Sequence, residues 1–524
     1  MDPAHAVVIG IDIGTTSTKA VAFDPAAKLL CSHSAGYELY EPEPGQAVQH
    51  ADEIYAAVLE CIRETVSGLD GRAVSGLCFS SAMHSLIGLD PHGVPLTAVL
   101  TWADSRAEVQ VERLRSGAAG PRLHRRTGTP VHPMSPLAKI VWFREREPEL
   151  AERVGHWVGI KELVLLRMCG ALVVDLSVAS ATGLLDIHRL RWDPEALGIA
   201  GLDPEQLSRL VPTATVLPRL TNEAARAVGL PVATPVVVGA SDGALASLGL
   251  GAVSPGVAAC SIGTSGALRV VVDRPAVDAL AGLFCFVLTE ERWVIGGAIN
   301  NGGVVLDWAG DTLAPDLGSE PEQSLLDLAA RVPAGSGGLV MLPYLLGERA
   351  PHWSAVPRGA YVGLTRAHRR EHLVRAALEG VCMQLALVLH AMRAAGHEVR
   401  EIRATGGFAR SPLWRQMLAD VLGMDIRFPG GHEGSGLGAA LLGMKALGLL
   451  PSLEAAADLV QIKETVRADP AAAATYAALL PVFSGLYEAL VPTFAALRRL
   501  SPSLPLEREG THRRDGGPGG FMMP

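Results

Sequence analysis

The sequence predicts an α/β protein built from two similar halves, and three observations support this. Short Val- and Ile-rich runs alternate with longer amphipathic segments along most of the chain. A chain of 524 residues is longer than one hydrophobic core usually organises, so at least two domains are expected. The segment 13–24 (IGTTSTKAVAFD) also resembles the segment 262–273 (IGTSGALRVVVD), with five of twelve positions identical. We therefore expect a duplicated fold.

Each half is expected to begin with a strand, a tight turn and a second strand. In the first half, the apolar runs 7–13 and 19–24 flank a GTTST turn, which predicts a hairpin. The further elements expected in this half are a helix (51–69), a strand (75–81), a helix-rich stretch (136–170) and a buried strand (234–240).

The segment 249–259 is rich in turn residues and is the expected domain boundary. It divides the chain into an N-terminal domain, 1–252, and a C-terminal domain, 253–500. The remaining residues, 501–524, end in RRDGGPGGFMMP and are expected to be disordered. The helical region 452–500 could cover the second domain or a partner, and the sequence does not decide between these.

Composition argues against several classes of function. The net charge of −9 is spread along the chain, and no block of Lys or Arg suggests nucleic-acid binding. The most apolar region, 231–263, is interrupted by proline and aspartate, so we expect no membrane-spanning helix and no membrane partner. The N-terminus has no basic export signal, and the seven cysteines have no metal-ligand spacing. A cytoplasmic protein with free thiols is predicted, and a homodimer is left open.

Asp12 lies within the first apolar strand, where a carboxylate must be paired, protonated or bound to a cation. A structural role is also open, in which it accepts hydrogen bonds from the amides of its own turn. The next residues, Gly14, Thr15 and Thr16, favour a binding role. A glycine permits a tight turn whose amides and hydroxyls suit phosphate oxygens, and Lys19 adds a positive charge beyond the turn.

The second half repeats this donor turn with Gly263 and Thr264, but Ser261 stands where Asp12 would be. Two phosphate-facing turns with one metal-capable carboxylate imply an asymmetric nucleotide site between the halves. A third turn contains Gly406 and Gly407. Its glycines would let the backbone approach a flat ligand closely, although a Gly-Gly pair is usually only a turn.

Asp242 follows the apolar strand 234–240 and precedes a predicted helix. It suits a helix N-cap, and from the residues alone capping is the more ordinary interpretation. The carboxyl end of a strand in an α/β sheet is also where catalytic groups converge. A carboxylate that faces a substrate hydroxyl there can act as the base for phosphoryl transfer.

With these three turns, the chain resembles the FGGY family of carbohydrate kinases, part of the actin, hexokinase and Hsp70 ATPase superfamily. The resemblance covers about residues 7–490 and includes both family signatures, MSPLAKIVWFRE (134–145) and GAYVGLTRAHRREHLVRAALEG (359–380). Arg146 departs from the polar or acidic residue that usually ends the first signature. The resemblance implies two duplicated actin/hexokinase-like (ribonuclease H-like) domains with a nucleotide and sugar cleft between them.

The resemblance also implies roles for individual residues, with ATP and Mg²⁺ as cofactors. Asp242 would be the catalytic base, and Asp12 and Asp242 would be the metal contacts. The residues implied to contact the nucleotide are Gly14, Thr15, Thr16, Lys19, Gly263, Thr264, Gly406 and Gly407. The residues implied to contact the sugar are Met83, His84, Trp102, Asp104 and Arg106.

Plainer interpretations of the sugar-side residues stay open. Met83 could be a core residue, His84 a hydrogen-bonded loop histidine, and Asp104 with Arg106 a solvated ion pair. Segments such as SSAMHS, TWADSR and AINNGGVVLDW look most like the gluconate kinase branch of the family. That likeness predicts phosphorylation of D-gluconate to 6-phosphogluconate.

Other functions also stay open. Xylulose kinases share the Met-His pair and the GERAPH stretch (347–352), so a xylulose, other pentulose or polyol kinase is an alternative. A gluconate carboxylate would need cations or hydrogen-bond donors, and Arg106, His84, His132 and Lys139 are available. The alternative of another class is a regulatory protein on the same fold that binds nucleotide without catalysis.

Overall fold

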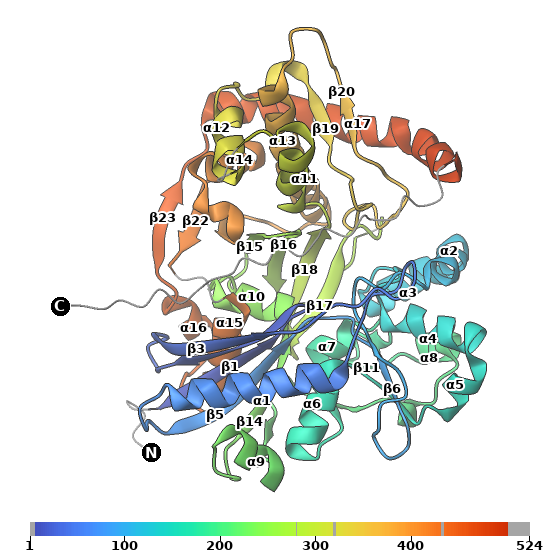
Figure 1. Cartoon of the computed structure of the whole chain (residues 1–524), viewed down its shortest axis with the longest axis vertical. Coiled ribbons are helices and arrows are strands. Elements are labelled where there is room, and N and C mark those ends of the chain that lie inside the picture. The colour runs from blue at the N-terminus through green and yellow to red at the C-terminus, as the bar shows by residue number, and fades with distance from the viewer. Residues whose placement is uncertain (1–5, 279, 318–320, 431–433, 501–524) are drawn as a thin grey trace, which may run out of the picture.

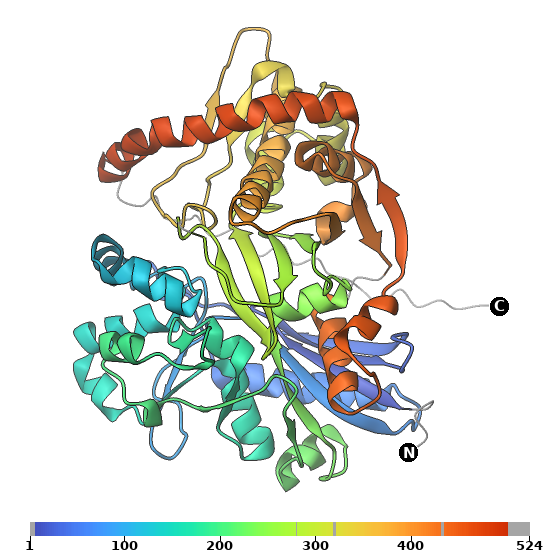
Figure 2. The same cartoon turned by 180° about the vertical axis from the view of Figure 1, so that it is seen from behind.

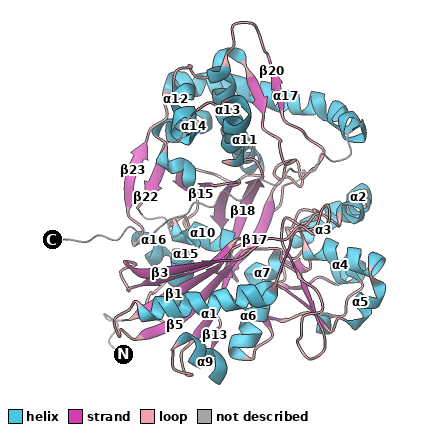
Figure 3. Ribbon diagram, in the orientation of Figure 1, coloured by secondary structure: helices cyan, strands magenta, loops and turns pink. Residues whose placement is uncertain are grey.

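The structure is a computed structural model that describes residues 6–278, 280–317, 321–430 and 434–500. The molecule has two halves, each centred on a mixed β-sheet flanked by helices (Figures 1 and 3). The predicted α/β class and the predicted duplication are confirmed. The predicted tail, 501–524, lies outside the described residues.

The N-terminal sheet has the strand order β13-β14-β5-β1-β2-β3. β1 (Val7–Ile13) and β2 (Ser17–Phe23) form the predicted antiparallel hairpin. β5 (Val74–Ser81) lies parallel to β1 and to β14 (Val236–Ser241), so these three strands end at one edge of the sheet. The outer strands are β3 (Leu29–Gly36) and β13 (Val216–Leu217).

The C-terminal sheet has the strand order β17-β18-β16-β15-β21-β22-β23. β15 (Val257–Ile262) and β16 (Gly266–Val272) form a hairpin, and β15 lies parallel to β21 (Glu401–Thr405). The order β18-β16-β15-β21-β22 therefore repeats the order β3-β2-β1-β5-β14 of the first half. The remaining strands are β17 (Phe284–Thr289), β18 (Arg292–Ile299), β22 (Ile426–Pro429) and β23 (Ile462–Val466).

The two hairpins differ in length by one residue at the turn. In the first hairpin Ile13 pairs with Thr18, whereas in the second Ile262 pairs with Gly266. An ungapped alignment of the two repeats is therefore wrong beyond the turn. With the register of the strands as a guide, Arg269 takes the place of Val21.

Two helices pack against each other between the sheets, α10 (Asp242–Gly249) and α15 (Gly434–Ala446) (Figure 1). α15 follows β22 of the C-terminal sheet but packs on β1 and β5 of the N-terminal sheet. This packing requires glycine, because a Cβ atom on Gly10 of β1 would lie 2.1 Å from the carbonyl oxygen of Gly436. The first residues of both helices therefore lie at the junction of the halves.

The other helices flank the sheets. Those of the N-terminal half are α1 (Ala51–Ser67), α2 (Glu108–Ser116), α3 (Ala119–Thr127), α4 (Pro136–Arg146), α5 (Pro148–Arg153), α6 (Ile160–Cys169), α7 (Leu176–Ser180), α8 (Pro194–Ala200) and α9 (Asn222–Val228). Those of the C-terminal half are α11 (Val304–Leu313), α12 (Pro321–Ala330), α13 (Arg370–Ala394), α14 (Pro412–Leu422), α16 (Leu453–Asp458) and α17 (Pro470–Leu500).

β17 joins the halves, because it belongs to the C-terminal sheet and hydrogen-bonds to the N-terminal half. The amide of Cys285 donates to the carbonyl of Gly128 at 2.8 Å, and the amide of Val287 donates to Ser180 Oγ at 2.9 Å. α17 makes a second connection. It lies on α13 and α14, and at its far end Arg498 donates to Glu108 of α2 at 2.6 Å (Figure 2).

Two helices in the described part of the chain are long and apolar enough to cross a membrane by length and composition, which the sequence interpretation missed. The most apolar window of α13 is 89% buried, so α13 is a core helix of the C-terminal half. The corresponding window of α17 is 11% buried. Length and composition alone are weak evidence for a membrane span.

Candidate active site

Asp12 lies near the end of β1, half-buried, and both of its carboxylate oxygens accept hydrogen bonds from serine hydroxyls. Ser80 Oγ on β5 lies 2.7 Å from Oδ1, and Ser435 Oγ at the start of α15 lies 2.5 Å from Oδ2. Lys19 is the cross-strand neighbour of Asp12 on β2, so both side chains lie on the same face of the sheet. The contact with Ser435 places Asp12 at the junction of the halves.

Asp242 is the first residue of α10 and directly follows β14. The N-cap of this helix is Ser241, and no side chain caps the helix, so the structure does not adopt the capping role considered for Asp242. Its Oδ1 instead accepts a hydrogen bond from the neighbouring amide of Gly243 at 2.6 Å.

The surroundings of Asp242 shift its acidity. The pKa of Asp242 is raised to about 6, first by burial and second by the negative charge of Asp12. The positive charges of Arg269 and Arg349 lower the pKa in part. The influence of Asp12 means that the two carboxylates, which are 230 positions apart in the sequence, lie close together at the junction.

Hydrogen bonds from neighbouring residues to its backbone hold the first turn in place. Gly14 closes it by donating its amide to Ser17 O at 2.9 Å. Tyr37 Oη donates to Gly14 O at 2.7 Å, and Gln49 Nε2 donates to Thr15 O at 2.6 Å. Thr16 is exposed at the tip. The turn is therefore preorganised by its neighbours.

The second turn lies beside the N-terminus of α11. The amides of Gly302 and Gly303 donate to Thr264 O at 3.1 Å and to Gly263 O at 2.6 Å. Gly263 and Thr264 are both exposed, and a Cβ atom on Gly263 would meet open space. The glycine at this turn therefore leaves room for a ligand.

The third turn follows β21, next to the end of β15. Gly406 has a φ of +117°, and a Cβ atom there would lie 2.1 Å from Ile262 O, so only glycine fits. Gly407 has nothing within 4 Å of its Cβ position except Arg410 Nη2 at 3.8 Å. Because β15 and β21 are parallel neighbours, the second and third turns share one edge of the sheet.

Of the five predicted sugar-side residues, Met83 lies near Asp242, Trp102 contacts the first turn, and His84 contacts the N-terminal half at Ala181. A Cβ atom on Gly243 would lie 3.0 Å from Met83 Cε, so Met83 lies beside the start of α10. His84 is buried, has a φ of +70°, and has its Nδ1 2.7 Å from Ala181 O. Trp102 Nε1 donates to Thr15 Oγ1 at 2.9 Å, which connects the predicted sugar loop to the first turn.

Asp104 and Arg106 are engaged with each other in a buried pair. Arg106 Nη2 lies 2.8 Å from Asp104 Oδ2, and the side chains are 10% and 0% exposed. Asp104 also accepts the amide of Ala47 at 3.0 Å, and Arg106 lies over the ring of Trp142. The suggested solvated pair is therefore wrong, and contact of either residue with a sugar stays a prediction.

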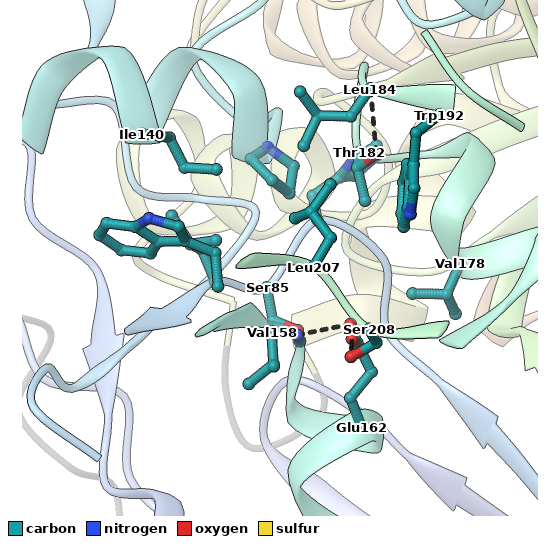
Figure 4. A pocket seen from close by; sticks show the side chains of 15 residues that line it. Ser85, Ile140, Val158, Glu162, Val178, Thr182, Leu184, Trp192, Leu207 and Ser208 are labelled. Atoms are coloured by element: carbon teal, nitrogen blue, oxygen red, sulfur yellow. Dashed lines mark hydrogen bonds between the residues drawn. The ribbon is translucent and has the colours of Figure 1, made fainter. Parts of the chain in front are cut away.

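A small cavity of about 20 Å³ is lined by His84 and by residues of the N-terminal half (Figure 4). Its lining includes Glu162, which accepts hydrogen bonds from Ser208 Oγ and from the amide of Gly159. This cavity has room for about one water molecule, so it is not the sugar site.

Sequence reasoning missed two arginines that the C-terminal half brings to Asp242. Arg269 of β16 lies with Nη1 3.4 Å from Ser261 Oγ, and a Cβ atom on Gly243 would lie 3.4 Å from its Nε. Arg349 lies with its guanidinium 5.0 Å from the ring centre of Trp102. Arg269 could have been found as a charged residue in an apolar strand, which is the pattern that identified Asp12. Arg349 could have been found through its place in the GERAPH stretch.

Comparison with known proteins identifies the class of this site. The N-terminal domain model of the FGGY family of carbohydrate kinases matches residues 7–249, and the C-terminal domain model matches residues 258–447. The chain belongs to the FGGY family of carbohydrate kinases. It is therefore a phosphotransferase, and carbohydrate kinases of this family use ATP as the phosphate donor.

The similar proteins are named either as gluconate kinases or as xylulose kinases. A gluconokinase from Bacillus subtilis is 43% identical over 91% of this chain and 95% of its own length. A xylulose kinase from Staphylococcus epidermidis is 30% identical over 86% and 89%. Two crystal structures from Lactobacillus acidophilus, a gluconate kinase and a ligand-bound xylulose kinase, each match with a TM-score of 0.91 at 36% identity, covering 94% of this chain and 99% and 100% of theirs.

Proposed function

We propose that this kinase phosphorylates D-gluconate with ATP to give 6-phosphogluconate. The observation that carries the proposal is the closeness of Asp12 and Asp242 at the junction of the halves, beside turns suited to phosphate. The choice of gluconate is supported by the higher identity to a gluconokinase, 43%, than to a xylulose kinase, 30%. The similarity of the fold alone does not separate these two substrates.

Asp242 is the proposed catalytic base. With a pKa of about 6, its carboxyl group is mostly ionised at pH 7 and can accept a proton from the substrate hydroxyl. Met83, beside the start of α10, would pack against the sugar carbon next to that hydroxyl. The base orients the oxygen toward the transferred phosphoryl group and accepts its proton late in the reaction.

Asp12 is the proposed anchor for Mg²⁺, and Asp242 is a second predicted metal contact. The donors around Asp12 are oxygens, from its own carboxylate and the hydroxyls of Ser80 and Ser435, which fits Mg²⁺. Among the described residues, no group of three or more His, Cys, Asp or Glu side chains is arranged to hold a metal ion. This fits an ion held mainly by phosphate oxygens and water, and the ion would neutralise charge on the phosphates.

The turns are the proposed phosphate and adenosine contacts. Thr15, Thr16 and Thr264 supply hydroxyls and amides, and Lys19 supplies a positive charge on the same face as Asp12. Gly406 and Gly407 would allow the adenosine to approach the end of β21.

Trp102 and His84 are the proposed walls of the sugar site. Trp102 donates a hydrogen bond to Thr15, so the proposed sugar loop directly contacts the proposed phosphate turn. We also infer a cytoplasmic location, which suits the seven free cysteines.

A coupled assay of ADP release tests the proposed function. The purified chain is supplied with ATP and Mg²⁺ and, in parallel, with gluconate, xylulose, ribulose, glycerol or erythritol. We expect turnover with gluconate to exceed the others in kcat/KM. A higher kcat/KM for xylulose than for gluconate would contradict the proposed substrate. ATP hydrolysis at the same rate with and without each polyol, or no hydrolysis at all, would favour the regulatory alternative.

A further inference from the structure

Three of the four residues that the sequence offers for a substrate carboxylate, Lys139, Arg106 and His84, have other partners or are neutral. The Lys139 ammonium group donates to the carbonyls of His84 and Thr101 at 2.7 and 2.6 Å, and Arg106 is paired with Asp104. Burial lowers the pKa of His84 to about 3, so its ring is neutral at physiological pH.

Arg115 on α2 has a guanidinium group with unused hydrogen-bonding capacity. Its Nε donates to Val131 O at 2.7 Å. Its Nη2 is shielded from solvent and has no hydrogen-bond partner among the residues that the structure describes. A buried, unsatisfied donor on a charged group costs free energy unless a ligand completes it.

Arg349 lies on the other side of the same region and is held rigidly. Its Nε donates to Asn300 Oδ1 at 2.7 Å, its Nη2 donates to Ile299 O at 3.1 Å, and its guanidinium lies over Trp102. These contacts fix two of its three nitrogens and leave Nη1 for a ligand.

His132 lies near both arginines. It directly follows Val131, which holds Arg115, and its ring contacts Trp353, four residues beyond Arg349, at a centroid distance of 5.7 Å. Burial and the positive charges of Arg115 and Arg349 lower the pKa of His132 well below its usual value. Its Nδ1 accepts the amide of Met134 at 3.2 Å, so the neutral ring carries its proton on Nε2 as a further donor.

Three carboxylates lie near this cluster. Glu348 accepts the amides of Asn300 and Arg349, and burial raises its pKa to about 7, which weakens it as a counter-charge. Glu112 and Glu108 on α2 both act on the charge of Arg115, and Glu108 is bound by Arg498. Among the described residues, no carboxylate accepts a hydrogen bond from Arg115 Nη2.

We propose that Arg115 and Arg349, one from each half of the chain, bind the carboxylate of the sugar acid. The inference rests on the proposed gluconate kinase function and identifies the residues that recognise the acid. Arg349 acts on both Asp242 and His132, whereas Arg115 acts on His132. Arg349 is therefore near both Asp242 and His132, and Arg115 is near His132. An extended six-carbon acid would span these groups, with its terminal hydroxyl at Asp242 and its carboxylate at the two arginines.

The test compares Arg115→Gln with Arg113→Gln, a matched control on the same helix. Arg113 is 59% exposed and pairs with Glu145, away from the cluster. We expect Arg115→Gln to raise the KM for gluconate roughly 10- to 100-fold, which corresponds to loss of one charge-assisted contact, with little change in kcat. The KM for ATP should not change, and Arg113→Gln should behave as wild type.

Inhibition by D-glucitol, which has a hydroxymethyl group in place of the carboxylate, separates charge recognition from packing. Its inhibition constant should be the same in wild type and Arg115→Gln. Arg115→Lys, which keeps the charge, should recover part of the gluconate affinity, and thermal unfolding checks that each variant is folded.

Two results would overturn the assignment of Arg115 alone: an unchanged KM for gluconate in a folded Arg115→Gln, or equal weakening of gluconate and D-glucitol. A wild-type chain that phosphorylates xylulose and leaves gluconate untouched would instead overturn the proposed function, and the carboxylate site with it.

Discussion

The two halves of the molecule share a framework but place their acidic residues differently. In the first half the strand residue is Asp12, and the helix that packs on this sheet contributes Ser435. In the second half the equivalent strand residue is Ser261, and the helix that packs on this sheet, α10 of the N-terminal half, begins with Asp242. The acid and the hydroxyl have therefore exchanged places between strand and helix.

We expect this exchange to suit one carboxylate for a metal and the other for a proton. Asp12, half-buried, is next to hydroxyl donors and Lys19, whereas Asp242, also half-buried, is next to two arginines. A duplicated fold can thus hold two different chemical groups at one junction.

Replacing Asp242 should remove catalysis but not nucleotide binding. For Asp242→Asn we expect kcat to fall roughly 100- to 10,000-fold, because a positioned base typically contributes that much. Steady-state kinetics and a binding measurement with an ATP analogue check this. A variant with near-native kcat would show that Asp242 is not the base.

The same substitution should stabilise the fold at high pH. The folded-state pKa of about 6 exceeds the ordinary value of 3.8, so the ionised carboxylate costs stability above pH 6 and costs nothing below about pH 3.8. Asp242→Asn should therefore raise the Tm at pH 8 and leave it unchanged near pH 3.8. Equal shifts at both pH values would contradict the assigned burial.

The third turn, which lies in the C-terminal half, should not tolerate a side chain at Gly406. Gly406→Ala would place a Cβ atom 2.1 Å from Ile262 O at a φ of +117°, at a strain of about 1–3 kcal/mol. We expect a lower Tm and a higher KM for ATP. Gly407→Ala is the matched control, because its Cβ position is open. If the two variants behave alike, the close approach at Gly406 does not matter.

The pH dependence of activity should show the effect of Arg269 on the pKa of Asp242. Activity should fall below about pH 6 as Asp242 becomes protonated. The positive charge of Arg269 lowers the pKa of Asp242, so Arg269→Gln should move this acidic limb to higher pH. The pH dependence of kcat/KM measures the shift, and movement toward lower pH would show that the charges act differently.

The smallest effect is expected at the support of the first turn. Trp102→Phe keeps the ring under Arg349 but removes the hydrogen bond to Thr15. We expect a loss of about 0.5–1.5 kcal/mol in ATP binding, seen as a KM increase of less than about tenfold. An unchanged KM would mean that Trp102 does not position the turn.

Local patterns in the sequence predicted the framework of the fold well. Apolar runs around the Gly14 turn gave the hairpin, and the repeat at Gly263 gave the duplication. The sequence did not reveal that the two hairpin turns differ in length by one residue, because the residue types after a turn do not determine how the two strands pair. The split of the chain at 252/253 stays a prediction.

The site was predicted in part. Asp12 could be recognised because a carboxylate in an apolar strand is unusual, whereas its partner Ser435 lies 423 positions away in a helix of small residues. Arg115 and Arg349 come together only through tertiary packing, which spacing in the sequence does not reveal. Two opposite charges close in sequence suggested that Asp104 and Arg106 form a solvated pair, but the fold buries both side chains.

The dependence of turnover on free Mg²⁺ tests the division of labour between the two carboxylates most directly. Wild type, Asp12→Asn and Asp242→Asn would be assayed with gluconate and ATP over a range of Mg²⁺ concentrations. We expect Asp12→Asn to need several-fold more Mg²⁺ for half-maximal turnover, and Asp242→Asn to lower the maximal rate with a much smaller change in that concentration. A larger Mg²⁺ requirement in Asp242→Asn than in Asp12→Asn would contradict the account.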